Sequence, residues 1–155
     1  DWVKALGANP TPLAFPELYA AMEQKAVDGQ ENPISVILAN KFAEVQKHLA
    51  MTNHQYNPQS MIISKKFWDT LSAAEKKIIQ DAAHDASVFQ RKTSRDLAAA
   101  QLAELKKAGM QVTELPAAEV AKLRDKMKQV IEKHSASVGA AVVQEVQAEL
   151  AKLRK

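Results

Sequence analysis

The sequence predicts an α/β fold that belongs to a larger structure, and three observations carry this prediction. Short apolar, strand-like runs alternate with helical patterns along the 155 residues, as is typical of an α/β arrangement. One helical pattern runs from Ser72 to about Lys107; at ~1.5 Å per residue it would extend for about 50 Å, more than the width of a small domain. The convincing strands are too few for a self-sufficient doubly wound sheet, so we expect a missing half.

The N-terminal region predicts two short helices. Pro16 opens the first, which stops near Asp28-Gly29. Asn32-Pro33 has the form of an N-cap residue followed by a proline at the first helical position, so a second short helix is expected to begin there.

Three segments are predicted to be strands. Lys47 to Asn53 and Ser60 to Ser64 are apolar enough to be buried, and Met61-Ile62-Ile63 makes the second the stronger case. The segment from Met110 to Leu115 alternates apolar and polar residues, which indicates a third short strand.

The long helix has clear signals at both ends. Ser72-Ala73-Ala74-Glu75 is a capping box, in which a hydroxyl and a carboxylate satisfy the first free N–H groups. Gly109 supplies the stop. Apolar residues recur at three- and four-residue intervals and predict one continuous inward face: Ile78, Ala82, Ala86, Phe89, Thr93, Leu97, Leu102 and Leu105.

Two further helices complete the chain. Pro116 opens the first, and the stretch from Ser135 to Gly139 is expected to break it before the last helix begins. Their predicted inward residues are Val120, Leu123, Met127, Val130, Ile131 and His134 in the first helix and Val142, Val146, Leu150 and Leu153 in the second.

Composition and charge exclude several classes of function. Lys and Arg number 21 against 18 Asp and Glu, and the signs are interleaved. The basic pairs Lys65-Lys66 and Lys76-Lys77 have acidic neighbours, so we expect no nucleic-acid partner. No cysteine is present, which excludes disulfides, thiolate metal sites and cysteine nucleophiles. No run approaches the ~18 consecutive apolar residues of a membrane span.

No pattern indicates catalysis, a metal or a cofactor. The sequence contains no GxGxxG, P-loop, HExxH or GxSxG motif. Its four histidines are scattered, and a metal site needs several convergent ligands. We therefore predict no catalytic residues, no metal and no cofactor.

The best candidate for a binding site is the segment from Asp28 to Pro33. It places polar side chains at a helix start, where free N–H groups favour an anion, and an Asn amide can both donate and accept. The alternative is a plain turn with an N-cap. Phe15 is either a wall for a ligand or a core residue, and Met51-Thr52-Asn53-His54 follows a predicted strand end, where α/β ligand crevices form.

In order, these segments closely resemble the C-terminal half of the solute-binding subunits of tripartite ATP-independent periplasmic (TRAP) transporters of the DctP type. The residues that carry the resemblance are Gly7-Ala-Asn-Pro-Thr-Pro-Leu-Ala-Phe15, Glu17-Leu-Tyr19, Val27-Asp-Gly-Gln-Glu-Asn-Pro33, Lys41-Phe42, Glu44-Val-Gln-Lys47, Met51-Thr-Asn-His54, Ile63-Ser-Lys-Lys-Phe-Trp68 and the long helix.

The resemblance implies a two-lobed periplasmic receptor that closes on a small carboxylate and delivers it to the transporter's membrane subunits. Residues 1–57 would be part of lobe II, residues 58–97 a segment of lobe I with the start of a helix that bridges the lobes, and residues 98–155 the return to lobe II. Asn32 matches the family's ligand-contacting Asn, and Phe15 matches the aromatic residue beside the ligand. His54 lies where some members use a His in a network with the ligand or with water.

Tyr56-Asn57-Pro58-Gln59 is expected to contribute to substrate choice through Gln59. Together with the stretch from Phe89 to Lys92, it is similar to members that bind sugar acids of the uronate type. C4-dicarboxylates are the alternative ligand class.

The chain departs from the family in length and in one residue. A full member is roughly twice as long, and its carboxylate-clamping Arg lies upstream of the segment at Gly7, whereas no Arg here precedes Arg91. The chain also opens at Asp1 without a methionine, so we expect a first half to be missing. The uncovered surface could instead make the chain a self-associating structural module or dimer.

Overall fold

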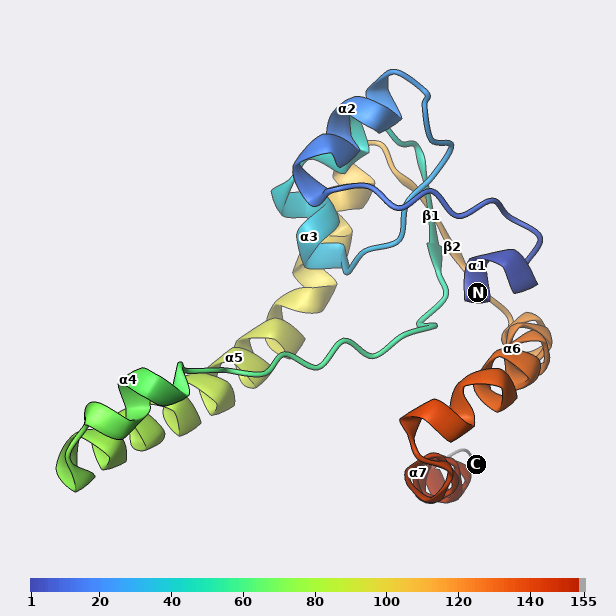
Figure 1. The fold of residues 1–155 in the computed structure, drawn as a ribbon. Coiled ribbons are helices and arrows are strands. Elements are labelled where there is room, and N and C mark those ends of the chain that lie inside the picture. The colour runs from blue at the N-terminus through green and yellow to red at the C-terminus, as the bar shows by residue number, and fades with distance from the viewer. Residues whose placement is uncertain (154–155) are drawn as a thin grey trace. The chain divides into compact units, whose positions relative to one another are not determined.

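A computed structural model describes residues 1–153, which divide into two compact units (Figure 1). The first unit combines Asp1–Phe15 with Glu114–Lys155, and the second is Pro16–Thr113. The elements in chain order are α1 (Trp2–Ala5), η1 (Phe15–Glu17), α2 (Leu18–Glu23), α3 (Ile34–Ala39), η2 (Phe42–Glu44), β1 (His48–Met51), α4 (Lys65–Thr70), α5 (Ala73–Lys107), β2 (Gln111–Glu114), α6 (Ala117–Val138) and α7 (Ala140–Leu153).

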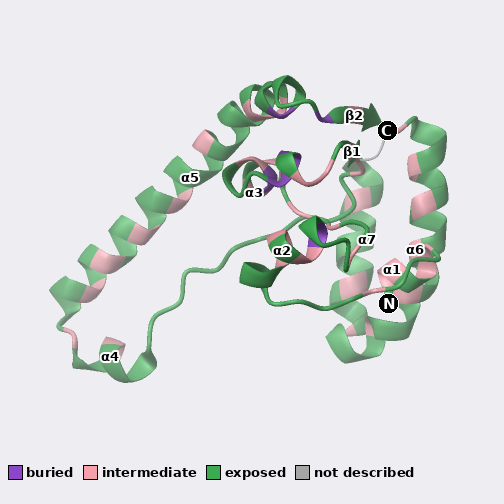
Figure 2. Cartoon of the chain, turned by 90° about the horizontal axis from the view of Figure 1, so that it is seen from above, coloured by how far each residue is buried: buried purple, intermediate pink, exposed green. Residues whose placement is uncertain are grey.

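The buried residues of the second unit form one small core. They come from α2, α3, η2, the C-terminal end of α5 and the residue before β2, and Figure 2 shows how few they are. The core residues are Met22, Ile37, Phe42, Ala43, Leu105 and Met110. Helix α3 packs against α5 beside this core.

A two-stranded sheet of β1 and β2 confirms two of the predicted strands. The backbone N–H of Gln111 donates to the carbonyl of Lys47 at 2.7 Å, which joins the start of β2 to the residue before β1.

The remaining predicted strand, Ser60 to Ser64, is wrong for this chain. These residues form no assigned strand, and Ile62 is 89% exposed. A strand needs a neighbour for its backbone N–H and C=O groups. Within the described residues the sheet contains only β1 and β2, so this apolar run remains unpaired.

The long helix is confirmed, with its predicted ends. Helix α5 has 35 residues, and the side chain of Ser72 and the carboxylate of Glu75 form the complete capping box. Gly109 has φ +91°, the left-handed conformation expected after a helix. The prediction of one continuous buried face is wrong, because Leu105 is 0% exposed whereas Phe89 is 71% exposed.

The first predicted helix is shorter than expected. Helix α2 ends at Glu23 rather than near Asp28-Gly29, and Lys25 takes the left-handed conformation (φ +57°) two residues after the helix. Lysine occupies a position that usually favours glycine or asparagine, so the sequence carried no visible stop signal there.

The first unit contains α1 in contact with α6, and α6 in contact with α7. The predicted break at Ser135–Gly139 is limited to Gly139 (φ +110°). His134 does not point into a core as expected; its Nε2 lies 2.7 Å from Asp1 Oδ2, which also accepts from Lys133 Nζ at 2.8 Å. No described helix combines the length and the apolar character needed to cross a bilayer.

Candidate ligand-binding site

Two of the predicted site segments meet in the second unit. His54 Nε2 lies 3.3 Å from Glu31 Oε2, and this contact joins the segment before α3 to the segment after β1. The other ring nitrogen, Nδ1, lies 2.6 Å from Thr52 Oγ1. Asn53 between them has φ +44°, a left-handed turn that Asn tolerates better than most residues. The imidazole of His54 is therefore held from both sides.

Asn32 does not cap a helix, so the plain N-cap interpretation is wrong. Helix α3 begins at Ile34, and its N-cap position is occupied by Pro33. The Asn32 amide instead donates from Nδ2 to Gln30 Oε1 at 2.6 Å, in a half-buried position. An amide nitrogen carries two hydrogens and its carbonyl can accept, so Asn32 retains the capacity to bind a carboxylate or a hydroxyl.

Phe15 and Gln59 remain predictions as site residues. Phe15 begins η1 and is about half exposed, which disfavours the core interpretation. Phe15 is the last residue of the N-terminal segment that belongs to the first unit, whereas Asn32 and His54 belong to the second unit. Gln59 lies exposed in the irregular segment between β1 and α4.

Charge also bears on the site. Glu31, whose Oε2 lies 3.3 Å from His54 Nε2, would repel the carboxylate of an anionic ligand. The site therefore combines an amide, an imidazole and one carboxylate, all of which can form hydrogen bonds.

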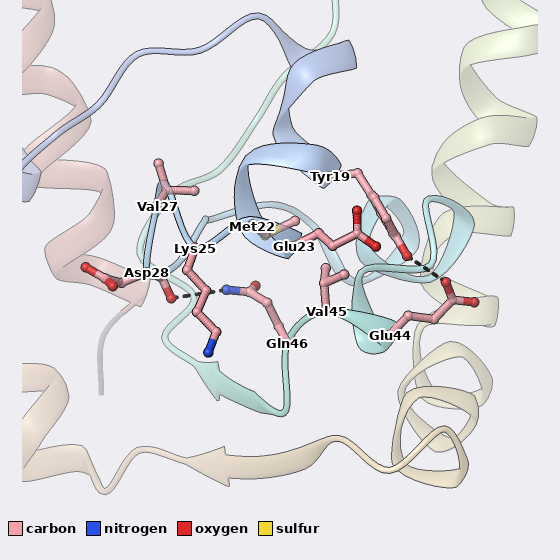
Figure 3. A pocket seen from close by; sticks show the side chains of 9 residues that line it. All are labelled: Tyr19, Met22, Glu23, Lys25, Val27, Asp28, Glu44, Val45 and Gln46. Atoms are coloured by element: carbon pink, nitrogen blue, oxygen red, sulfur yellow. Dashed lines mark hydrogen bonds between the residues drawn. The ribbon is translucent and has the colours of Figure 1, made fainter.

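A surface hollow of about 610 Å³ lies beside this segment, between α2 and η2 (Figure 3). Tyr19 donates its hydroxyl hydrogen to Glu44 Oε2 at 2.8 Å, and this hydrogen bond raises the pKa of Tyr19. Gln46 Nε2 donates to the carbonyl of Asp28 at 3.5 Å, at the start of the candidate segment. None of the four predicted ligand residues lines this hollow, and of the two hydrogen bonds only the one from Gln46 to Asp28 involves the candidate segment.

Sequence reasoning missed three of these residues. Glu31, Thr52 and Gln46 all lie within segments that the sequence analysis recognised, but none of the three had a role assigned. Glu31 and Gln46 have partners that are distant in sequence, so only the folded chain pairs them, whereas Thr52 contacts its near neighbour His54. Among residues 1–153 no three His, Asp or Glu side chains converge as metal ligands would.

The sequence matches the DctP family, described as "Bacterial extracellular solute-binding protein, family 7", over residues 1–137. The chain spans about half the length of the curated relatives it matches.

Three solved structures share its fold, and all are periplasmic solute-binding proteins or sugar acid-binding proteins. The one from Ochrobactrum anthropi is 54% identical, with a TM-score of 0.85 over 99% of this chain and 48% of that one; it is described with the C-terminus bound in the ligand-binding pocket. The one from Polaromonas sp. JS666, bound to D-erythronate, is 46% identical, with a TM-score of 0.86 over 94% of this chain and 47% of that one.

The third, from Advenella mimigardefordensis, is in complex with galactonate and is 42% identical, with a TM-score of 0.90 over 97% of this chain and 49% of that one. The family match, the α/β elements and the long helix α5 therefore all indicate the same family of proteins. This chain belongs to the DctP family of bacterial TRAP solute-binding proteins and represents part of their two-lobed α/β fold.

Proposed function

We propose that this chain is part of a periplasmic TRAP receptor, not an enzyme, that captures a sugar acid and delivers it to the transporter's membrane subunits. The observation that carries the proposal is that the relatives bound to D-erythronate and galactonate are 46% and 42% identical to this chain. Both ligands combine one carboxylate with a row of hydroxyl groups.

The candidate site has chemistry that suits such a ligand. Asn32 would donate to the carboxylate or to a hydroxyl, since an amide serves both. His54, held by Glu31 and Thr52, would present its ring edge or order a water beside the ligand. Phe15 would flank the carbon chain, and Gln59 would contribute to the choice among sugar acids.

We further propose the lobe assignment of the chain. Residues 1–57 form part of lobe II, residues 58–97 belong to lobe I and begin the bridging helix, and residues 98–155 return to lobe II. In the whole receptor, ligand contacts made across the cleft would favour the closed state over the open one.

The isolated chain is expected to bind weakly. A guanidinium forms two parallel hydrogen bonds with a carboxylate, a geometry that Lys4 or Lys25 cannot reproduce. The chain has no Arg before Arg91 and spans only about half of its relatives.

The test is therefore a method that detects weak binding. The ¹⁵N-labelled chain is titrated with galactonate, D-erythronate and succinate while amide resonances are followed by NMR. We expect the two sugar acids to shift the side-chain amide of Asn32 and the backbone amides around His54, with succinate causing smaller shifts at equal concentration.

Asn32→Ala should weaken binding of galactonate by about 1–3 kcal/mol, the cost of losing a hydrogen bond to a charged group. The matched control is Asn40→Ala, which removes an exposed amide that donates to the Val36 carbonyl at 2.9 Å. If succinate causes the larger shifts, the dicarboxylate alternative replaces the sugar acid. Shifts that spare both Asn32 and His54 would contradict the proposed site.

A further inference from the structure

Gln30 and Asn32 form a pair of side-chain amides within the candidate segment. Asn32 Nδ2 donates to Gln30 Oε1 at 2.6 Å, and both residues are half-buried. Glu31 between them has a different partner, because its Oε2 lies 3.3 Å from His54 Nε2. Side chains that alternate in this way are typical of an extended backbone. The two amides therefore lie together, and the carboxylate between them contacts another part of the chain.

The proline that follows the pair favours this arrangement. Pro33 occupies the N-cap position of α3 with φ −59° and ψ +149°, and the helix begins only at Ile34. The residue before a proline is disfavoured in the helical conformation, so Asn32 is biased toward an extended one. An extended backbone directs the side chains of residues i and i+2 to the same side, as the contact between Gln30 and Asn32 requires.

This hydrogen bond decides what the Asn32 amide offers to a ligand. A carboxamide has two N–H hydrogens and a carbonyl oxygen. Gln30 accepts one of these hydrogens, which leaves one N–H and Oδ1 for a ligand. Exchanging the nitrogen and oxygen of Asn32 while Gln30 stays in place would bring two carbonyl oxygens together. Asn32 therefore presents one donor and one acceptor in a fixed order.

A second amide pair with the same spacing differs in both direction and exposure. Gln55 Nε2 donates to Asn57 Oδ1 at 2.8 Å, so the glutamine is the donor there. Both of those residues are exposed, and water competes for their amides, whereas Gln30 and Asn32 are half-buried. A polar group that is shielded from water costs more to leave without its partner. The Gln30–Asn32 pair is thus the better suited of the two to hold a side chain for recognition.

We propose that Gln30 is a positioning residue that makes Asn32 selective for an acid with a hydroxyl group beside its carboxylate. The remaining N–H of Asn32 donates to a carboxylate oxygen, and Oδ1 accepts from the neighbouring hydroxyl. A plain carboxylate has acceptors alone and leaves Oδ1 without a donor. This role rests on the proposed function, because it requires that Asn32 contacts the ligand. It narrows the ligand class to acids that are hydroxylated at the carbon next to the carboxylate.

The first measurement uses the unliganded chain. The two side-chain hydrogens of Asn32 are followed by ¹⁵N NMR in the wild type, in Gln30→Met and in Gln30→Glu. Methionine has only a weakly accepting sulfur, so the hydrogen-bonded resonance should move to the position of a free amide. An ionised glutamate accepts but cannot donate, so the resonance should be retained. A resonance that stays in Gln30→Met, or that is lost in Gln30→Glu, overturns the proposal.

The second measurement tests selectivity with two acids that differ in one hydroxyl group. The ¹⁵N-labelled chain is titrated with D-erythronate and with 3,4-dihydroxybutanoate of matching configuration, which lacks the hydroxyl beside the carboxylate. The wild type should bind D-erythronate about threefold to tenfold more tightly, the effect of one hydrogen bond. Gln30→Met should reduce this ratio at least about twofold, because the Asn32 amide is no longer held in one orientation. The matched control is Gln24→Met, the same substitution at the exposed glutamine that ends α2, and it should keep the wild-type ratio.

The outcomes separate this role from simpler ones. An equal loss of affinity for both acids in Gln30→Met, with the ratio unchanged, would reveal a purely structural residue and overturn the proposal. Equal affinities of the wild type for the two acids would overturn it as well. A wild type that binds neither acid contradicts the proposed function, while the resonances of the unliganded chain still decide whether Gln30 orients Asn32.

Discussion

Replacing Leu105 by alanine tests where the long helix is held. Leu105 is 0% exposed and is one of six buried residues in the core of the second unit. Its truncation removes the transfer free energy of the lost methyl groups and leaves a cavity against neighbours such as Ile37 and Phe42. The free energy of unfolding should fall by about 2–5 kcal/mol.

Leu97 provides the matched comparison on the same helix. It was expected on the same inward face, but the structure leaves it 45% exposed. Leu97→Ala should change the free energy of unfolding by no more than about 0.5 kcal/mol, because little apolar area is uncovered and alanine is the better helix former.

The assay is urea unfolding of both variants and the wild type, followed by far-UV circular dichroism. We expect a lower midpoint for Leu105→Ala with an unchanged slope, since the slope reports the surface exposed on unfolding. A small domain has a total stability of about 5–15 kcal/mol, so the expected loss is a large share of it. Equal midpoints for the two variants would refute the assignment of the core to the C-terminal end of α5.

The remaining predictions concern the capping box of α5 and the hydrogen bond between Tyr19 and Glu44. Ser72→Ala should lower the stability of the chain by about 1 kcal/mol, measured by thermal unfolding, because the N-cap of α5 is lost. The same capping box lowers the pKa of Glu75, so its contribution is present above the ordinary carboxyl pKa and is lost as the pH falls through the lowered value; the deficit of Ser72→Ala should shrink in acid, and a constant deficit would contradict this. The Glu44 hydrogen bond raises the pKa of Tyr19, so ultraviolet titration should show one tyrosine ionising above the usual range. Glu44→Ala, which removes the acceptor, should bring that titration back toward the ordinary value, whereas an unaltered curve would rule out this hydrogen bond as the cause.

The elements that sequence reasoning predicted well are those that depend on neighbours in sequence. The capping box at Ser72 and Glu75 and the stop at Gly109 bound α5 as expected, because both act within one helical turn. The end of α2 was missed, since Lys25 takes a left-handed conformation that its residue type does not announce.

The candidate site also has features that the sequence predicts and features that only the structure shows. Its segments could be recognised from residue order alone, and Asn32 and His54 were both named. That Asn32 bonds to Gln30 instead of capping α3, and that Glu31 approaches His54, became visible only in the folded chain.

By itself, the sequence determined the family, the α/β class and the long helix, because these follow from ordered motifs and from local hydrogen bonding. Only the tertiary structure decided which apolar residues are buried. The periodicity of α5 treats Leu105 and Phe89 alike, yet one lies in the core and the other in solvent. Burial depends on a partner surface from elsewhere in the chain, and a pattern along one helix carries no information on whether that surface is present.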